Sequence, residues 1–162
     1  MDSNRSVKLS ELVEEYRLEV LRKGKDYEKF RVTTEDVSRP GLQLSGYFDY
    51  FDADRIQIIG KIECTYLEGM TSERRREAFG KLFSLDIPAL IISRGMEPFP
   101  ECMEMAEKYD RTILRSQQKT TAIQGALFTG LRNQLAPRIT RHGVLMEIYG
   151  EGVFLTGESG VG

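Results

Sequence analysis

The clearest strand pattern in this chain is Ile87-Pro88-Ala89-Leu90-Ile91-Ile92. It is short, apolar and rich in β-branched residues, and it is bounded by Asp86 and by Ser93-Arg94-Gly95, a pattern typical of a buried strand. It is far too short to cross a bilayer. A similar run, Arg55-Ile56-Gln57-Ile58-Ile59-Gly60, predicts a second buried strand that ends at its glycine.

Helical patterns separate and follow these two runs. Ser72 is in a position to cap a helix that continues through Phe83. Pro98 and Pro100 open a helix that runs to about Tyr109, and the longest helix is expected to be stopped by Pro137. The apolar positions at helical spacing, which we interpret as core, are Ala78, Phe79, Leu82, Phe83, Cys102, Met105, Ala106, Tyr109, Ile123, Ala126, Leu127, Leu131 and Leu135.

Shorter elements are predicted in the first fifty residues. Residues 7–9 and 31–33 alternate as short strands, and Ser10 offers an N-cap to a helical stripe over residues 12–16. Pro40 is a plausible start for a helix over residues 42–48. Strands alternating with helices over residues 7–135 predict an α/β fold with a mostly parallel sheet flanked by helices.

The pattern changes after Pro137, where we place a domain boundary. Residues 1–137 are predicted to form an N-terminal α/β domain, and residues 138–162 to begin a second unit. Residues 140–148 alternate, Gly150-Glu151 suits a two-residue turn, and residues 153–156 give a second strand. This pattern predicts a β-hairpin.

The composition narrows the class of protein. The net charge is −2 with 30% charged residues, so bulk electrostatics favour neither a nucleic-acid partner nor an anionic membrane. The Arg74-Arg75-Arg76 run is interpreted as a solvated helix face. With two cysteines, no secretory signal and a single histidine, the chain is expected to be cytoplasmic, and no metal site is predicted from its residues.

The hairpin leads into Gly157-Glu158-Ser159-Gly160-Val161-Gly162, which matches the first six positions of the phosphate-binding pattern G-x-x-x-x-G-K-[S/T]. Glycines let the backbone fold around a phosphate so that successive N–H groups point at its negative charge. A glycine-rich flexible tail would give the same letters. On the first interpretation the chain is the front part of a longer P-loop enzyme, with the loop truncated.

His142 is the candidate catalytic residue. If the hairpin turns at Gly150-Glu151, His142 falls opposite Ser159 and within roughly 7 Å of the loop entrance. A histidine there can donate a hydrogen bond or carry a proton near neutral pH. The alternative is a strand histidine that packs beside Val144 and Met146.

Several separate motifs, in the same order, resemble the HPr kinase/phosphorylase family. They are Arg39-Pro40-Gly41-Leu42, Gly46-Tyr47-Phe48-Asp49-Tyr50-Phe51, Arg55-Ile56-Gln57-Ile58-Ile59-Gly60-Lys61, Arg138-Ile139-Thr140, Arg141-His142-Gly143-Val144-Leu145 and the terminal glycine loop. The resemblance implies a bifunctional enzyme that phosphorylates a serine of the phosphocarrier protein HPr and removes that phosphate by phosphorolysis, in the control of carbon catabolite repression.

The resemblance also implies the cofactors and the assembly. ATP or pyrophosphate would be the phosphoryl donor, Mg²⁺ the metal, and the full-length protein a hexamer formed through its kinase domains. The N-terminal domain would resemble those of Mur ligases. His142 matches the family's active-site histidine, and residues 157–162 match the start of its nucleotide loop.

The loop lysine, the magnesium-binding serine and the catalytic aspartate of the family have no counterpart up to Gly162, so these 162 residues are expected to be inactive alone. The alternatives are a stand-alone regulatory or interaction module of α/β fold, without nucleotide chemistry, and an unrelated P-loop nucleotide kinase with an added front domain.

Overall fold

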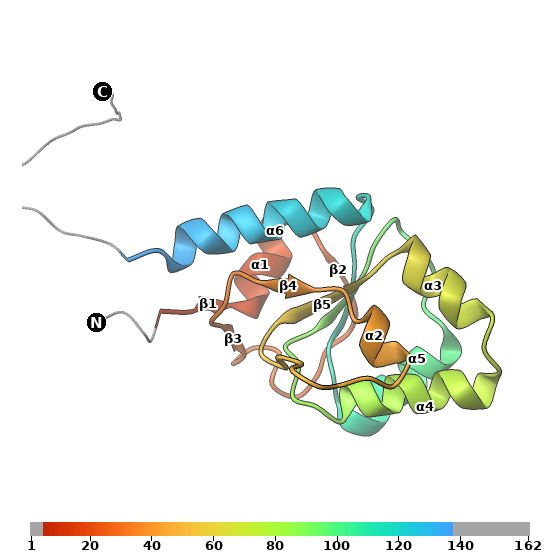
Figure 1. The fold of residues 1–162 in the computed structure, drawn as a ribbon. Coiled ribbons are helices and arrows are strands. Elements are labelled where there is room, and N and C mark those ends of the chain that lie inside the picture. Colours follow the sequence, from red (N-terminus) through yellow and green to blue (C-terminus); the bar gives the residue numbers. More distant parts are fainter. Residues whose placement is uncertain (1–4, 138–162) are drawn as a thin grey trace, which may run out of the picture.

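A computed structural model of the protein describes residues 5–137, and it shows a five-stranded sheet with helices on both faces (Figure 1). In spatial order the strands are β2 (Glu19–Arg22), β7 (Ile113–Arg115), β6 (Leu90–Ile92), β5 (Ile56–Ile59) and β4 (Val37–Ser38). The strands from β4 to β7 are parallel, and β2 pairs antiparallel with β7. The predicted α/β class is confirmed, with a mixed sheet.

Helices cover both faces of the sheet, and each face has its own apolar core. One face carries α2 (Gly41–Leu44), α3 (Lys61–Glu68), α4 (Ser72–Phe83) and α5 (Pro100–Tyr109). The other carries α1 (Leu9–Glu15), α6 (Thr120–Leu135) and a small antiparallel pair, β1 (Val7–Lys8) with β3 (Arg31–Val32). Figure 1 shows α6 and α4 on opposite sides of the sheet.

The two apolar runs form the centre of the sheet because their side chains pack alternately into the cores on its two faces. In β5, Ile56 and Ile58 enter the cluster under α1 and α6, whereas Ile59 enters the cluster under α3, α4 and α5. The same alternation places Ile91 on one face and Ile92 on the other. A parallel strand covered on both faces is expected to be apolar at successive positions. Both runs have this pattern, except at Gln57 of β5, which is polar and buried.

Several predicted boundaries differ from the structure. Leu9 already begins α1, so Ser10 is not its N-cap, and Thr71 rather than Ser72 caps α4, where its hydroxyl accepts a hydrogen bond from the Arg74 amide at 3.2 Å. The helix predicted over residues 42–48 is the four-residue α2; the chain leaves it through Gly46, whose φ of +108° only glycine adopts readily.

The predicted solvated face of three arginines is wrong for Arg75. Its guanidinium donates to Glu101 Oε1 at 3.0 Å and to the carbonyl oxygens of Leu67 and Met70 at 3.1 and 2.7 Å. Ser72 Oγ donates to the other oxygen of Glu101 at 2.6 Å. This buried ion pair joins the start of α4 to the start of α5 and to the end of α3.

Elements for which the sequence analysis gave no residue range are β2, β4, β7 and α3. Arg17, with φ of 55°, separates α1 from β2. The predicted hairpin over residues 140–156 lies outside the described residues, as does the segment beyond the boundary predicted near Pro137. In residues 5–137, no helix combines the length and the apolar character that a bilayer crossing requires.

Candidate functional site

The site residues predicted from the sequence all lie outside the described part of the chain. They are His142, Gly157, Glu158, Ser159, Gly160, Val161 and Gly162. Within residues 5–137, two groups of polar side chains lie at the ends of the central strands: one at the edge where the parallel strands end, and one in a small pocket at the opposite edge.

The carboxyl edge of the sheet is where open α/β folds hold their ligands, because the loops after parallel strands meet there. In this protein the residues that follow β4, β5, β6 and β7 are Arg39, Gly60, Ser93 and Ser116. The edge also receives the first turns of α3 and α6, which begin at Lys61 and Thr120. A binding or catalytic group is therefore expected at this edge.

An arginine–carboxylate pair occupies one side of this edge. Arg39 donates two hydrogen bonds to Glu63, at 3.0 and 2.8 Å, and the Gly60 amide donates to Glu63 Oε1 at 2.7 Å. Burial raises the pKa of Glu63, but the hydrogen bonds from Arg39 and Gly60 outweigh it, so the pKa lies below its ordinary value of 4.5. The carboxylate is charged at neutral pH, and its oxygens are engaged by these donors.

A pair of hydroxyls occupies the centre of the edge. Ser93 Oγ and Thr120 Oγ1 are 2.6 Å apart and buried. Thr120 reaches this position because residue 60 is glycine: a Cβ on Gly60 would lie 2.2 Å from Thr120 Oγ1. The close approach fastens the first turn of α6 to the ends of β5 and β6.

The chemistry of this edge follows from these partners. Arg39 and Glu63 neutralise one another, Ser93 and Thr120 share a hydrogen bond, and Ser116 Oγ accepts one from the Gln118 amide at 3.1 Å. These groups hold α3 and α6 against the sheet. We assign them a positioning role, with no free acid or base among the five.

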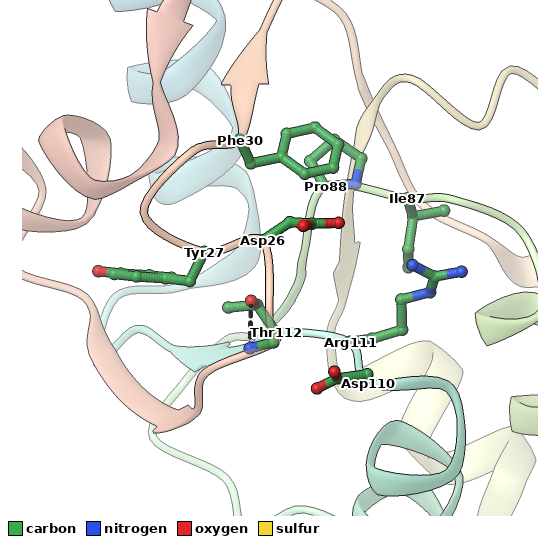
Figure 2. Close-up of a pocket in the computed structure, with 9 residues that line it drawn as sticks. Asp26, Tyr27, Phe30, Ile87, Pro88, Asp110, Arg111 and Thr112 are labelled. Carbon is green, nitrogen blue, oxygen red and sulfur yellow. Dashed lines mark hydrogen bonds between the residues drawn. The ribbon is translucent and has the colours of Figure 1, made fainter.

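The pocket at the opposite edge lies where the segments around residues 24–30, 87–88 and 110–112 pack together (Figure 2). Phe30 and Pro88 form one side of it, and Asp110 and Arg111 the other. Its volume is about 10 Å³, which is room for roughly one water molecule. The pocket is too small for a substrate.

Two of the three charged residues that line this pocket, Asp110 and Arg111, are already paired. Arg22 Nη1 donates to Asp110 at 3.0 Å, and Arg111 donates to Asp86 at 2.9 Å and to the Phe83 carbonyl at 2.8 Å. The two segments pack closely here, since a Cβ on Gly24 would lie 2.5 Å from the Asp110 carbonyl oxygen.

Nucleophilic and metal chemistry have no evident site within residues 5–137. Burial raises the pKa of the Cys64 thiol to about 11 and raises that of Cys102 further, so both thiols are protonated at neutral pH. Among these residues no group of three His, Cys, Asp or Glu side chains is placed to hold a metal ion.

Sequence reasoning missed the pairing of Arg39 with Glu63, although a signal was present. Gly60-Lys61-Ile62-Glu63 is a capping pattern, in which a residue three positions into a helix turns back to the amide that precedes the helix. Nothing beside Arg39 in the sequence points to this pairing, because its partner lies 24 residues away, beyond the reach of local patterns.

Comparisons with known proteins agree on one family. The family described as "HPr Serine kinase N terminus" matches residues 7–131. The HPr kinase/phosphorylase of Caldicellulosiruptor bescii is 46% identical over 154 residues, covering 95% of this chain and 50% of that protein. That of Alkaliphilus metalliredigens is 52% identical over 131 residues, covering 81% of this chain and 42% of the relative.

A third relative is similar to this chain in sequence, and a solved structure is similar to it in fold. The HPr kinase/phosphorylase of Clostridium acetobutylicum is 40% identical over 156 residues. The crystal structure of the CBS and DRTGG domains of the regulatory region of Clostridium perfringens pyrophosphatase, complexed with the activator diadenosine tetraphosphate, shares the fold with a TM-score of 0.58. It covers 98% of this chain and 62% of that one at 16% identity, so the likeness concerns the fold alone.

The chain spans about half the length of the curated relatives that it matches. The match to the family extends over most of the chain, and the relatives share 40% to 52% of their aligned residues with it. The chain therefore belongs to the HPr kinase/phosphorylase family, and residues 7–131 are the part that matches its N terminus.

Proposed function

We propose that the full-length protein transfers a phosphoryl group to a serine hydroxyl of HPr and removes it again by phosphorolysis. In the forward direction ATP or pyrophosphate donates the phosphoryl group and leaves as ADP or inorganic phosphate, and the serine proton passes to a base. In the reverse direction inorganic phosphate attacks the phosphoserine and the phosphorus–oxygen bond to serine breaks. Pyrophosphate leaves, and the serine oxygen takes a proton back. We also propose that the enzyme works in the cytoplasm and assembles as a hexamer through its kinase domains.

One observation carries this proposal: identity to HPr kinase/phosphorylases continues beyond the α/β domain. The alignment with the Caldicellulosiruptor bescii relative spans 154 residues, so it extends past residue 137. A stand-alone regulatory module would have no need of that segment, which contains His142 and the glycine loop. The alignment therefore supports the enzyme over the module.

The proposed roles within that segment follow from elementary chemistry. Backbone amides of residues 157–162 would face the phosphates, and Mg²⁺ would neutralise charge on them when bound. His142 would hydrogen-bond to the reacting phosphate or relay the serine proton. Among residues 5–137 the structure offers no competing free acid–base pair at the two polar sites described above.

The test is transfer by the full-length protein. With ATP and Mg²⁺, it should add one phosphate to HPr, and it should add none to HPr whose acceptor serine is replaced by alanine. His142→Ala should lower kcat in both directions by about 10²-fold or more, which is the usual contribution of a general acid–base. Unchanged transfer in both directions would remove His142 from the site, and absence of HPr phosphorylation by the parent protein would refute the function.

The 162-residue chain serves as the matched control. Its glycines are not followed by the lysine that completes a phosphate-binding loop. We therefore expect it to transfer no phosphate under conditions in which the full-length protein does. Labelling of HPr by the shorter chain would contradict this expectation without contradicting the function of the full-length protein.

A further inference from the structure

A groove lies at the end of α4, on the face of the sheet that this helix covers. Its volume is about 340 Å³, within the range of pockets that hold small molecules. The segment between α2 and β5 forms one wall, and the end of α4 with the two residues after it forms the other. The groove, which we call the Phe48–Lys81 groove, is lined by Phe48, Phe51, Ala53, Lys81, Ser84 and Leu85.

The first wall is aromatic. The rings of Phe48 and Phe51 meet edge to face, with their centroids 5.7 Å apart. Both side chains are half-buried, since they pack against the core under α4 and also line the groove. Between them Tyr50 has φ of 62°, a backbone conformation that bulky residues rarely adopt. This strained turn holds two rings side by side, and a further ring can stack on them or meet them edge-on.

The second wall carries the charge of the groove. Lys81 alone is charged among the lining residues. Its side chain is exposed, and it forms no ion pair with any carboxylate of residues 5–137. The groove therefore presents one positive charge beside an aromatic surface.

The end of α4 does not use this charge. A lysine in the last turn of a helix ordinarily serves the carbonyl groups at the helix end. In α4 the four last carbonyls, of residues 80–83, already accept hydrogen bonds from the amides of Ser84 and Leu85, from Ser84 Oγ and from Arg111 Nε, at 2.7 to 3.2 Å. The ammonium group of Lys81 is thus free to bind an anion.

Lys81 also lines two further grooves along α4, but these have mixed charge. Both contain Glu77, together with Arg74 in one and with Arg76 and Lys108 in the other. An anion in either groove would meet a carboxylate as well as the cations. The lining of the Phe48–Lys81 groove contains no carboxylate, so this groove suits an anion best of the three.

We propose that the Phe48–Lys81 groove is a binding site for a small aromatic anion, a ring that carries a carboxylate, sulfonate or phosphate group. The ring packs against Phe48 and Phe51, and the anionic group lies at the ammonium group of Lys81. The inference goes beyond the phosphoryl transfer proposed above and does not depend on it.

The test is a fluorescence titration of the 162-residue chain with anilinonaphthalene sulfonate, an aromatic anion that brightens in apolar sites. We expect one saturable site per chain. Lys81→Gln should weaken binding of this probe by about 3- to 5-fold, because it removes one partly exposed charge pair. It should leave unchanged the binding of phenylnaphthylamine, which has the same rings without the sulfonate. Lys108→Gln is the matched control: it removes an exposed lysine that lines only a neighbouring groove and should leave both probes bound as in the parent.

A second pair of variants locates the probe. Ala53→Phe fills the groove, so it should weaken both probes by about 10-fold or more through a direct clash. Tyr50→Ser removes an exposed ring of the same segment that does not line the groove, and it should leave binding unchanged. Thermal unfolding of each variant shows that it is folded.

Three results would overturn the proposal. In the first, the parent chain has no saturable site for the anionic probe. In the second, Lys81→Gln binds that probe as tightly as the parent does. In the third, folded Ala53→Phe binds like the parent, since the probe would then lie elsewhere on the chain.

Discussion

Helices α4 and α6 are alike in the apolar packing of their buried sides and differ in the charge of their exposed sides. Each packs an apolar stripe on one face of the sheet, with Phe79, Leu82 and Phe83 in α4 and Leu127 and Leu131 in α6 fully buried. Figure 1 places the two helices on either side of the strands. The exposed side of α4 is rich in charge, whereas that of α6 has none before Arg132.

The charges of α4 are used within the domain. Arg75 reaches Glu101 and Arg76 reaches Glu104, each at 3.0 Å, so α4 is tied to α5 by ion pairs as well as by apolar contacts. Helix α6 forms no comparable ion pair within residues 5–137. Two helices can therefore be equally well packed on their buried sides and still differ in whether ion pairs tie their exposed sides to a neighbouring helix.

The largest expected effect tests whether the buried sides are equivalent. Phe79→Ala should lower the free energy of unfolding by about 3–5 kcal/mol and Leu127→Ala by about 2–5 kcal/mol, because each leaves a cavity in a fully buried cluster. Urea titration of the two variants measures both. Thr129→Ala, on the exposed side of α6, should change the value by less than about 0.5 kcal/mol. If Leu127→Ala lowers the free energy of unfolding as little as Thr129→Ala does, the buried sides of α4 and α6 do not contribute equally to stability.

An intermediate effect is expected at the ion pair that distinguishes α4. The hydrogen bonds of Arg75 hold the pKa of Glu101 at about 2, below its ordinary 4.5. Because the folded-state pKa is the lower one, the stabilisation is complete above pH 4.5 and is lost as the pH falls towards 2. Glu101→Gln should cost about 1.5–3 kcal/mol at neutral pH, and parent and variant should converge in acid. A gap between their unfolding curves that stays constant from pH 7 to the acid limit would refute this assignment.

The smallest effect compares one glycine in each helix. Gly125→Ala should raise the free energy of unfolding by about 0.5–1 kcal/mol, because the added Cβ would meet no atom within 4 Å. Gly80→Ala should gain less, because its Cβ would lie 3.3 Å from Met105 Sδ and that side chain must move. Thermal unfolding at low protein concentration measures both variants. A larger gain at Gly80 would show that α4, rather than α6, has the looser surroundings.

The elements that were predicted correctly are those with a local cause. The runs at residues 55–60 and 87–92 contain β5 and β6 because parallel central strands must be apolar on both faces. Helix α6 ends at Leu135, before Pro137, because proline lacks the amide that would continue it. These features depend on neighbours in the sequence.

The elements that were missed have causes far along the chain. Strand β4 exists because Val37 pairs with Ile56, and nothing in its two residues predicts a strand. Three successive arginines look alike in the sequence, but only Arg75 faces the carboxylate of Glu101 on the neighbouring helix. The predicted catalytic residues, His142 and the glycine loop, lie outside the described residues and stay predictions.

The two extremities of the described fold meet in one place. The Arg5 guanidinium donates to the carbonyl of Gln134 at 2.9 Å, 129 residues later in the chain. A unit whose first and last residues touch can be spliced into another polypeptide as a cassette, or circularly permuted by a short bridge between them, without stretching its core.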